Sequence, residues 1–209
     1  MVSDPGVRPI DDVRRSMYRA QILGAAESEF SRTGFAGTKV TAIAKAADLS
    51  LATVYKHFSG KEEIWDALHA DRMAELLAEV EEAGATTASP LARIMAGIGA
   101  VARYLARHDA YLDMSLWAGA GWASSRPAAY GVQRTVWSAG QETLVAGMRS
   151  ALDAGEVRGL EPRVAAGLVI ASLQVWLAEW VAGGRHEDAE ELVAAMLRRV
   201  EWMLVGPDE

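Results

Sequence analysis

The chain contains no cysteine among its 209 residues, which excludes disulfide bonds, thiol nucleophiles and thiolate metal ligands. It has no stretch of about 18 uncharged apolar residues that would predict a membrane span. Its first residues are too highly charged for a secretory signal. With neither cysteines nor a leader, we expect the protein to stay in the reducing environment of the cytoplasm.

Basic residues are outnumbered by acidic ones, 21 Lys and Arg against 28 Asp and Glu, so the net charge is −7. The acidic residues are unevenly distributed. Residues 1–65 hold nine Lys or Arg and eight Asp or Glu, whereas residues 66–209 hold twelve Lys or Arg and twenty Asp or Glu. A strongly acidic second part resists nonspecific adhesion to nucleic acid. If the first part binds DNA, it has to direct its few cations toward phosphate. Tight binding without regard to sequence is therefore not expected.

Strand patterns are missing, and apolar residues recur at helical spacing along the chain. With 51% hydrophobic residues, the chain can bury a substantial core. These features predict an all-α fold of about nine helices without internal repeats. Pro5 and Pro9 predict a loose N-terminal arm. The longer predicted helices cover about residues 12–32, 59–83, 94–107, 127–153, 162–181 and 188–204, with a short segment at 111–117.

The stretch from Arg19 to Ile64 carries three short apolar stripes, each of which buries one face of a helix. Between the second and third stripes, Asp48 suits the left-handed conformation of a tight turn, and Ser50 suits the N-cap of the next helix. Two helices joined by a turn of about three residues form a helix-turn-helix, so DNA is the first partner to consider. The stripes are Ile22, Ala26 and Phe30; Val40, Ile43, Ala44 and Ala47; and Val54 and Phe58.

A long helix is predicted to follow this segment directly. Ser59-Gly60-Lys61-Glu62 has the Ser-x-x-Glu spacing of a capping box at a helix start. The apolar spacing continues to about Ala83, with no flexible linker between the first and second parts of the chain. A continuous helix of this kind can transmit a tilt from one part to the other.

The same stretch closely resembles the N-terminal domain of the tetracycline-repressor (TetR) family of transcription regulators, over about 46 residues. Asp48 stands where the family usually has Gly, and Gly60 where a small polar residue is common; neither change threatens the fold. The matching residues are Ile22-Leu23-Gly24-Ala25-Ala26, Phe30, Gly34-Phe35, Ile43-Ala44, Leu49-Ser50, Thr53-Val54-Tyr55-Lys56-His57-Phe58 and Lys61-Glu62.

The resemblance implies two domains: an N-terminal arm and helix-turn-helix domain over residues 1–64, and a ligand-binding and dimerisation domain over residues 65–209. It implies a regulator, commonly a repressor, that leaves a palindromic operator when a hydrophobic or aromatic small molecule binds. Neither the operator, the regulated genes nor the effector is legible in the sequence, and the sign of regulation is inferred from the family. No cofactor and no metal are expected.

The DNA-reading residues are expected near the start of the recognition helix. Leu51 and Ala52 can contact thymine methyl groups, and Thr41 and Thr53 can donate to bases or phosphates, whereas Tyr55 and the basic residues suit phosphates. The candidate set is Lys39, Thr41, Ser50, Leu51, Ala52, Thr53, Tyr55, Lys56, His57 and Lys61.

Several of these residues have a purely structural alternative. Phe58 is expected in the core, and Tyr55 can also be a core aromatic. His57 can simply pack or cap, and Thr38 and Thr41 can cap the second helix. The arginines at positions 8, 14 and 15 either enter a minor groove or remain solvated.

One such domain reads only a few base pairs, so useful affinity calls for a dimer. The last two helices are the expected interface, because both carry apolar residues at helical spacing; the same residues would also suit an internal core. The residues are Val164, Leu168, Ala171, Val175 and Ala178 on the first, and Leu192, Met196, Val200 and Met203 on the second.

Six of the seven tryptophans lie beyond residue 66, which suits a pocket for apolar or aromatic ligands, although most will be ordinary core. An acidic residue among them would suit a cationic ligand. The candidate lining is Met95, Tyr104, Tyr111, Met114, Trp117, Trp122, Trp137, Gln141 and Trp176, with Asp113, Glu142 and Gln174 as further polar groups.

Two other classes of protein remain as alternatives. An all-helical, metal-dependent enzyme would use Asp66-x-x-His69 or His186-Glu187, but no His-Glu-x-x-His or phosphate-binding glycine loop accompanies them. An architectural DNA-binding protein without a ligand is opposed by the acidic second part. Equal affinity for unrelated duplexes would favour it.

Overall fold

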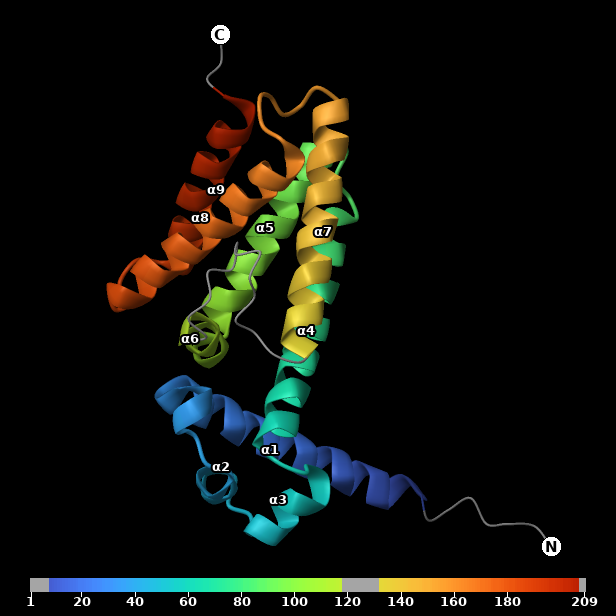
Figure 1. Cartoon of the computed structure of the whole chain (residues 1–209), viewed down its shortest axis with the longest axis vertical. Helices are drawn as coiled ribbons and strands as arrows, with labels where there is room; N and C mark the ends of the chain where they lie inside the picture. Colours follow the sequence, from blue (N-terminus) through green and yellow to red (C-terminus); the bar gives the residue numbers. More distant parts are fainter. Residues whose placement is uncertain (1–7, 118–131, 207–209) are drawn as a thin grey trace, which may run out of the picture. The chain divides into compact units, whose positions relative to one another are not determined.

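The computed structural model describes residues 8–117 and 132–206, and over these residues the chain forms nine helices and no strand (Figure 1). The all-α fold class predicted from the sequence is confirmed. The chain divides into two compact units, Met1–His69 and Ala70–Glu209.

The first helix of the first unit begins earlier than the sequence pattern indicates. α1 (Arg8–Gly37) includes Pro9, which the first turn of a helix tolerates because its missing N–H would have no partner there. The prediction of a loose arm up to about residue 12 is therefore wrong from Arg8 onward. Gly34 has φ 68° and ψ 170°, so the helical backbone is interrupted there, where the sequence predicted its end.

The helix-turn-helix consists of α2 (Val40–Ala46) and α3 (Leu51–His57). Asp48 takes φ 52°, as its place in the tight turn predicts. The Ser50 hydroxyl accepts a hydrogen bond from the Thr53 backbone N–H at 3.0 Å, which confirms the predicted N-cap. The core of this unit contains apolar side chains from all three predicted stripes, namely Ile22, Ala26, Phe30, Ile43, Ala44, Ala47, Val54 and Phe58.

α4 (Lys61–Gly84) begins in the first unit and ends in the second. The capping box at its start uses a different carboxylate from the predicted one. Glu63, not Glu62, accepts hydrogen bonds from the Ser59 backbone N–H at 2.6 Å and the Ser59 hydroxyl at 2.7 Å. The backbone bond, helped by the hydroxyl, lowers the pKa of Glu63 below its ordinary value.

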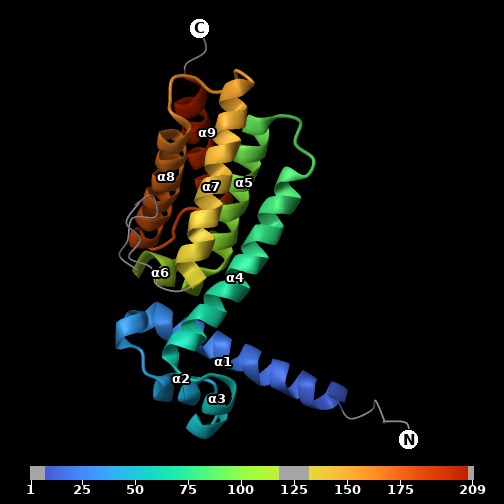
Figure 2. The ribbon, with the colours of Figure 1, turned by 45° about the vertical axis from the view of Figure 1, so that its right-hand side comes forward.

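The remaining helices of the second unit are α5 (Pro90–Arg107), α6 (Asp109–Trp117), α7 (Val132–Asp153), α8 (Pro162–Ala182) and α9 (Ala189–Val205). α5 packs against both α7 and α9, and α8 packs against α7 and α9, so these four helices enclose one core (Figures 1 and 2). The Ser89, Glu161 and Asp188 side chains cap α5, α8 and α9 by accepting backbone N–H bonds.

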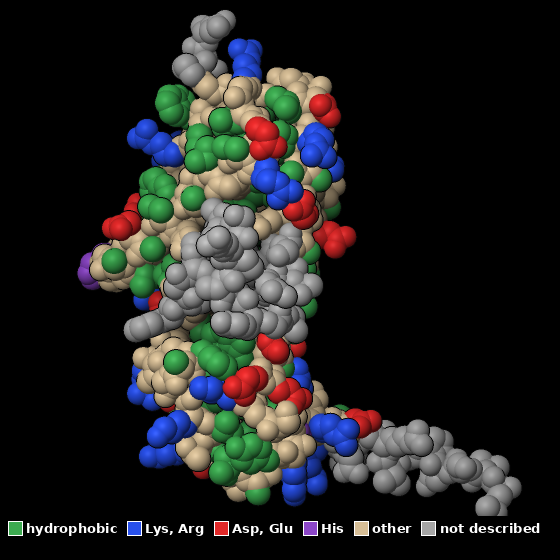
Figure 3. Space-filling view, viewed as in Figure 1, with side chains coloured by type: hydrophobic (Ala, Val, Ile, Leu, Met, Phe, Trp, Pro, Cys, Tyr) green, Lys and Arg blue, Asp and Glu red, His purple; other side chains and the backbone are tan. Residues whose placement is uncertain are grey.

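The two helices predicted to form a dimer interface differ in what they expose. On α9, Leu192, Met196 and Val200 are buried inside the chain, so their assignment to an interface is wrong; they form internal core. On α8, Val164, Leu168 and Val175 remain exposed, by 52%, 40% and 59%. Figure 3 shows hydrophobic side chains on the visible surface of the second unit, interspersed with acidic and basic ones.

α8 is also the one helix of the described chain that is long and apolar enough to cross a membrane, judged by length and composition alone. Core helices of globular proteins meet the same criterion. Here the apolar residues serve two surfaces, since Ala165, Val169, Leu173 and Leu177 face the core while other apolar side chains face outward.

Candidate DNA-binding surface and C-terminal pocket

α3 presents an outward face that is suited to reading DNA. Val54 is fully buried and anchors the helix, while Leu51 is 38% and Tyr55 52% exposed on the other side. Ala52 and Lys56 are exposed as well. The helix therefore presents four groups to a partner: the Ala52 methyl, the Leu51 isobutyl, the Tyr55 phenol and the Lys56 ammonium group. All four residues were predicted to contact DNA.

Two hydroxyl groups at the start of α3 are already engaged with one another. The Ser50 and Thr53 oxygens lie 2.7 Å apart, in addition to the capping bond from the Thr53 backbone N–H. Because a hydroxyl both donates and accepts, each can still make one further bond. Their first role is to hold the start of the helix in shape.

Three other residues that were predicted to contact DNA differ in their exposure to solvent. Lys39, the N-cap residue of α2, and Thr41 in its first turn are both exposed. His57 is half-buried, and its ring centroid lies 5.7 Å from that of Tyr18 on α1. His57 thus packs against α1, which was the structural alternative for this residue.

Lys61 has structural partners in place of the predicted phosphate. Its Nζ donates to the carbonyl oxygens of Phe35 at 2.7 Å and Thr38 at 3.0 Å, and it lies 4.4 Å from the Phe35 ring centroid. The ammonium group therefore clamps the segment that follows Gly34 to the start of α4.

Thr38 is likewise structural. Its side chain is buried, and its hydroxyl lies within hydrogen-bond distance of the carbonyl oxygens of Glu29 and Gly34 and of the Thr33 hydroxyl. It does not cap α2, because Lys39 occupies the N-cap position without a side-chain bond. Arg14 and Arg15 are exposed on α1, so they belong to a helix and not to an extended basic arm.

In the second unit, the predicted ligand-binding residues do not meet around one described cavity. Tyr104, Tyr111 and Met114 are almost completely buried in the core. Met95 and Gln141 are half-buried. Trp122 lies outside the described residues, as do the side chains of Trp117 and Trp137.

Tyr104 is tied to a polar network between α4 and α5. Its hydroxyl donates to Glu75 Oε2 at 2.7 Å, and Arg72 donates to the same oxygen at 2.9 Å. Burial and the bond to the Glu75 carboxylate raise the pKa of Tyr104 well above its ordinary value. Burial would raise the pKa of Glu75, but the bonds from Tyr104 and Arg72 outweigh it and lower that pKa.

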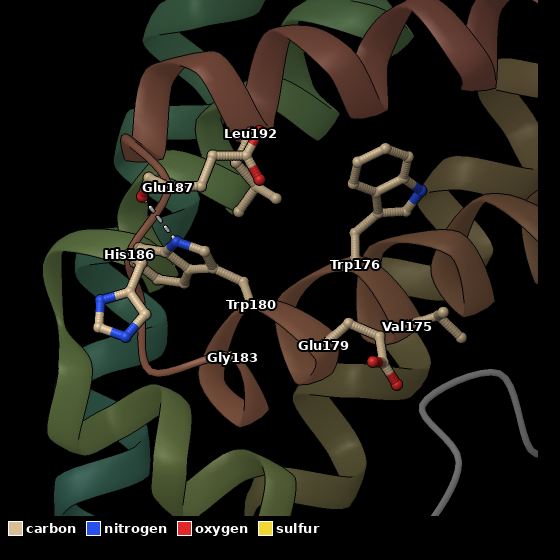
Figure 4. Close-up of a pocket in the computed structure, with 8 residues that line it drawn as sticks. All are labelled: Val175, Trp176, Glu179, Trp180, Gly183, His186, Glu187 and Leu192. Carbon is tan, nitrogen blue, oxygen red and sulfur yellow. Dashed lines mark hydrogen bonds between the residues drawn. The ribbon is translucent and has the colours of Figure 1, made fainter.

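A pocket of about 500 Å³ lies where α8 ends and α9 begins (Figure 4). Trp176 is the one predicted ligand-binding residue in its lining. The other lining residues were not predicted to bind a ligand: Trp180 was counted only among the tryptophans, and His186-Glu187 only as a weak catalytic pair. The complete lining is Val175, Trp176, Glu179, Trp180, Gly183, His186, Glu187 and Leu192.

The alternative enzyme sites do not form a metal centre within the described ranges, where no group of three His, Asp or Glu side chains is close enough to hold a metal ion. His69 is buried, with its ring centroid 4.5 Å from that of Trp65. Asp113 and Glu142, the other carboxylates considered for a ligand, are paired with Arg185 and Arg163.

A capped helix-turn-helix joined by one helix to an all-helical unit defines the class of helix-turn-helix DNA-binding regulators. Residues 22–68 match the family model described as bacterial regulatory proteins, tetR family. This N-terminal domain therefore matches the TetR family of transcription regulators, which confirms the resemblance seen in the sequence. A comparison with curated protein sequences gives no match.

Solved structures share the fold over nearly the whole chain. The transcriptional regulator FadR from Bacillus subtilis, in complex with stearoyl-CoA, has a TM-score of 0.75 at 20% identity, covering 91% of this chain and 99% of its own. The ketosteroid transcriptional regulator KstR2 of Mycobacterium tuberculosis has 0.75 at 21%, covering 90% and 95%. PfmR, a TetR family transcriptional regulator from Thermus thermophilus, has 0.71 at 24%, covering 91% and 97%.

Proposed function

We propose that this protein is a homodimeric transcriptional repressor that binds a palindromic operator and leaves it when a hydrophobic or aromatic small molecule binds the second unit. The observation that carries the proposal is the outward face of α3, where Leu51 and Tyr55 are exposed beside a fully buried Val54. Apolar and aromatic side chains on a recognition helix are hydrated unfavourably when they are exposed to solvent. In a DNA groove the same side chains can make apolar contacts with the bases.

Within this proposal, Leu51 and Ala52 contact base methyl groups, and Tyr55, Lys56 and Lys39 contact phosphates. Thr41, Ser50 and Thr53 supply hydroxyl groups at the edge of the same surface. Because few of these side chains are long hydrogen-bond donors, we expect specificity to depend on thymine methyl groups and on DNA shape as much as on base-edge hydrogen bonds.

The exposed face of α8 supports the dimer. Val164, Leu168 and Val175 are spaced by four and seven residues, so they lie on one face of the helix. An isologous contact would bury all three on each subunit. Two reading heads joined in this way would span successive major grooves, one helical turn or a multiple apart.

The small-molecule response rests on two features. Relatives in fold include one solved with stearoyl-CoA and one described as a ketosteroid regulator, which supports an apolar effector. α4 runs without a break from the first unit into the second, which supports coupling between them. A coupling of about 1–3 kcal/mol would reduce operator affinity roughly 5- to 150-fold. Because a regulator of this kind acts on DNA, we expect it in the cytoplasm.

The test is a fluorescence-anisotropy titration of the protein on duplex flanking its own gene, against a scrambled duplex, at several salt concentrations. We expect a preference of about a thousandfold and a log–log salt slope of about −0.9 per phosphate contacted. Tyr55→Ala should weaken operator binding at least about tenfold, or about 1.4 kcal/mol. Tyr55→Phe, which keeps the ring, shows how much of that loss is the hydroxyl.

Sedimentation analysis of the same variants tests folding and dimerisation independently of DNA binding. Tyr55→Ala should remain a dimer, because α3 shares no residue with the exposed face of α8. A Tyr55→Ala dimer that binds the operator as tightly as the parent protein would remove α3 from the DNA interface. Equal affinity for the native and scrambled duplexes would instead favour an architectural DNA-binding protein.

A further inference from the structure

The first turns of α1 extend beyond the core of the DNA-binding unit. Every residue from Asp12 to Met17 is exposed, and Ile22 is the first of the described side chains of this helix to be buried. The start of α1 runs out past α3 in both views of the ribbon (Figures 1 and 2). We call this part of α1, residues 8–17, the overhang. With a rise of about 1.5 Å per residue, it is about 15 Å long.

The overhang begins beside the C-terminal end of α3. On α1, the ring centroid of Tyr18 lies 5.7 Å from that of His57, the last residue of α3. Next to it, the Arg19 guanidinium lies 5.2 Å from the Phe58 ring centroid. The side of α1 that carries Tyr18 and Arg19 therefore faces the end of α3, the helix whose Tyr55 belongs to the proposed DNA surface.

Two arginines continue this side of α1 into the overhang. Arg14 and Arg15 each precede one of the two residues that contact the end of α3 by four positions, and side chains at this spacing share a helix face. Both are exposed, and within the described ranges neither has an ion-pair partner. By contrast, Arg32 near the other end of α1 is paired with Glu29 at 2.6 Å. Two cations without partners therefore lie one helical turn beyond the contact with α3.

The charge of the overhang is complementary to a DNA backbone. Phosphate contacts supply much of the affinity of a DNA-binding protein and fix its register. Of the three lysines predicted to contact DNA, Lys61 is engaged with carbonyl oxygens, which leaves Lys39 and Lys56 exposed. Residues 12–17 add two arginines against one carboxylate, Asp12, and so carry a net charge of +1. The overhang therefore supplies cations that the helix-turn-helix itself has in short supply.

We propose that Arg14 and Arg15 bind phosphates of the DNA backbone next to the base pairs that α3 reads. This inference rests on the proposed operator binding and extends the DNA contact beyond the helix-turn-helix. Because the overhang is helical before DNA binds, its arginines lose less conformational entropy than those of a disordered arm. Its length of about 15 Å equals that of about four base pairs at about 3.4 Å each. Phosphate contacts carry no sequence information, so they add affinity without adding preference.

The experiment measures the operator affinity of Arg14→Gln and of Arg15→Gln in the full chain by fluorescence anisotropy at several salt concentrations. A palindromic operator is bound by two copies of the chain, so each substitution removes two phosphate contacts. We expect the log–log salt slope to become shallower by about 1.8 and the affinity to fall at least about tenfold at about 0.1 M salt. The loss should be equal for the native and the scrambled duplex. Arg15→Lys, which keeps the charge, should retain the salt slope.

Three controls accompany the substitutions. Arg149→Gln removes an exposed cation from α7 in the second unit, so it changes the net charge equally and should leave affinity and salt slope unchanged. Urea unfolding of Arg14→Gln and Arg15→Gln should match that of the parent protein, because neither side chain has a partner to lose. Uncharged methylphosphonate linkages then locate the contact: the linkage that weakens binding of the parent protein should have no effect on Arg15→Gln.

Three results would overturn the assignment. Unchanged affinity and salt slope in both arginine variants would mean that the overhang remains solvated on DNA. An equal loss in Arg149→Gln would reduce the effect to net charge. Val13 is 68% exposed on the side of the helix away from Arg15, so a changed assembly state of Val13→Gln in sedimentation analysis, with arginine variants that bind DNA normally, would make the overhang a contact with a second copy.

Tyr55→Ala keeps these failures apart from failure of the proposed function. If Tyr55→Ala weakens operator binding while Arg14→Gln and Arg15→Gln do not, α3 reads the operator and the overhang does not contact it. If the parent protein does not distinguish the native from the scrambled duplex, the proposed function fails, and the salt slopes of the arginine variants still report whether the overhang touches phosphate.

Discussion

His69 provides the sharpest test of the energetics of this fold. Its side chain is 0% exposed, and burial lowers its pKa from 6.5 to about 4. The folded protein therefore binds fewer protons at this residue than the unfolded chain does between these two pKa values. Stability must fall as the pH falls through this window.

The magnitude follows from the two pKa values. Between about pH 7.5 and about pH 5, the unfolded imidazole gains a proton while the folded one remains neutral, which costs about 2 kcal/mol of unfolding free energy. The carboxylates with lowered pKa, Glu63 and Glu75, lose their contribution in the same direction but at lower pH. The loss above about pH 5 is thus attributable to His69 more than to these carboxylates.

Urea unfolding at fixed protein concentration measures the effect directly, since dimerisation makes stability depend on concentration. We expect His69→Leu to lose about 2 kcal/mol less than the parent protein over this pH range. If the variant does not fold, the Cε1–H resonance of His69 in the parent protein should titrate with a midpoint below about pH 5. A midpoint near 6.5, or an unchanged pH dependence in His69→Leu, would refute the burial argument.

Three further substitutions test individual contacts of the DNA-binding unit by urea unfolding. Ser50→Ala should destabilise the protein by about 1 kcal/mol through loss of the N-cap of α3, and an unchanged free energy of unfolding would show that the cap is dispensable. Lys61→Met should cost about 2 kcal/mol, because two charge-assisted bonds to carbonyl oxygens are lost; equal stability would return Lys61 to the list of free phosphate contacts. Asp48→Gly should stabilise the unit by up to about 1 kcal/mol, because glycine accepts φ 52° without strain, and destabilisation would mean that the Asp48 side chain contributes more than its backbone costs.

Much of the first unit was predictable because its signals are local. The stripes that contain Ile22, Ile43 and Val54 are buried as predicted, and the Asp48 turn and Ser50 cap depend only on residues within three or four positions. Even there the choice of Glu63 over Glu62 as capping partner was missed, since both are one turn from Ser59 and side-chain geometry decides between them.

The partners of long-range contacts were not predictable. Lys61 was predicted to bind phosphate, because its neighbours in the sequence do not show which groups lie near it in space. In the structure its Nζ lies within 3.0 Å of the Phe35 and Thr38 carbonyl oxygens. Helical spacing likewise identified apolar faces on α8 and α9 without saying which would be covered by the chain itself. The structure buries Met196 and leaves Val175 exposed.

The sequence by itself determined the helical class and the helix-turn-helix, because these follow from periodicity, turn chemistry and capping over short distances. The TetR family was indicated by the resemblance of residues within 22–68 to that family's N-terminal domain. Only the tertiary structure decided which apolar faces stay exposed, which cations are engaged, and where two indoles and two carboxylates surround a pocket. Those outcomes depend on packing between segments far apart in the chain, and a linear pattern of residues carries no distance between them.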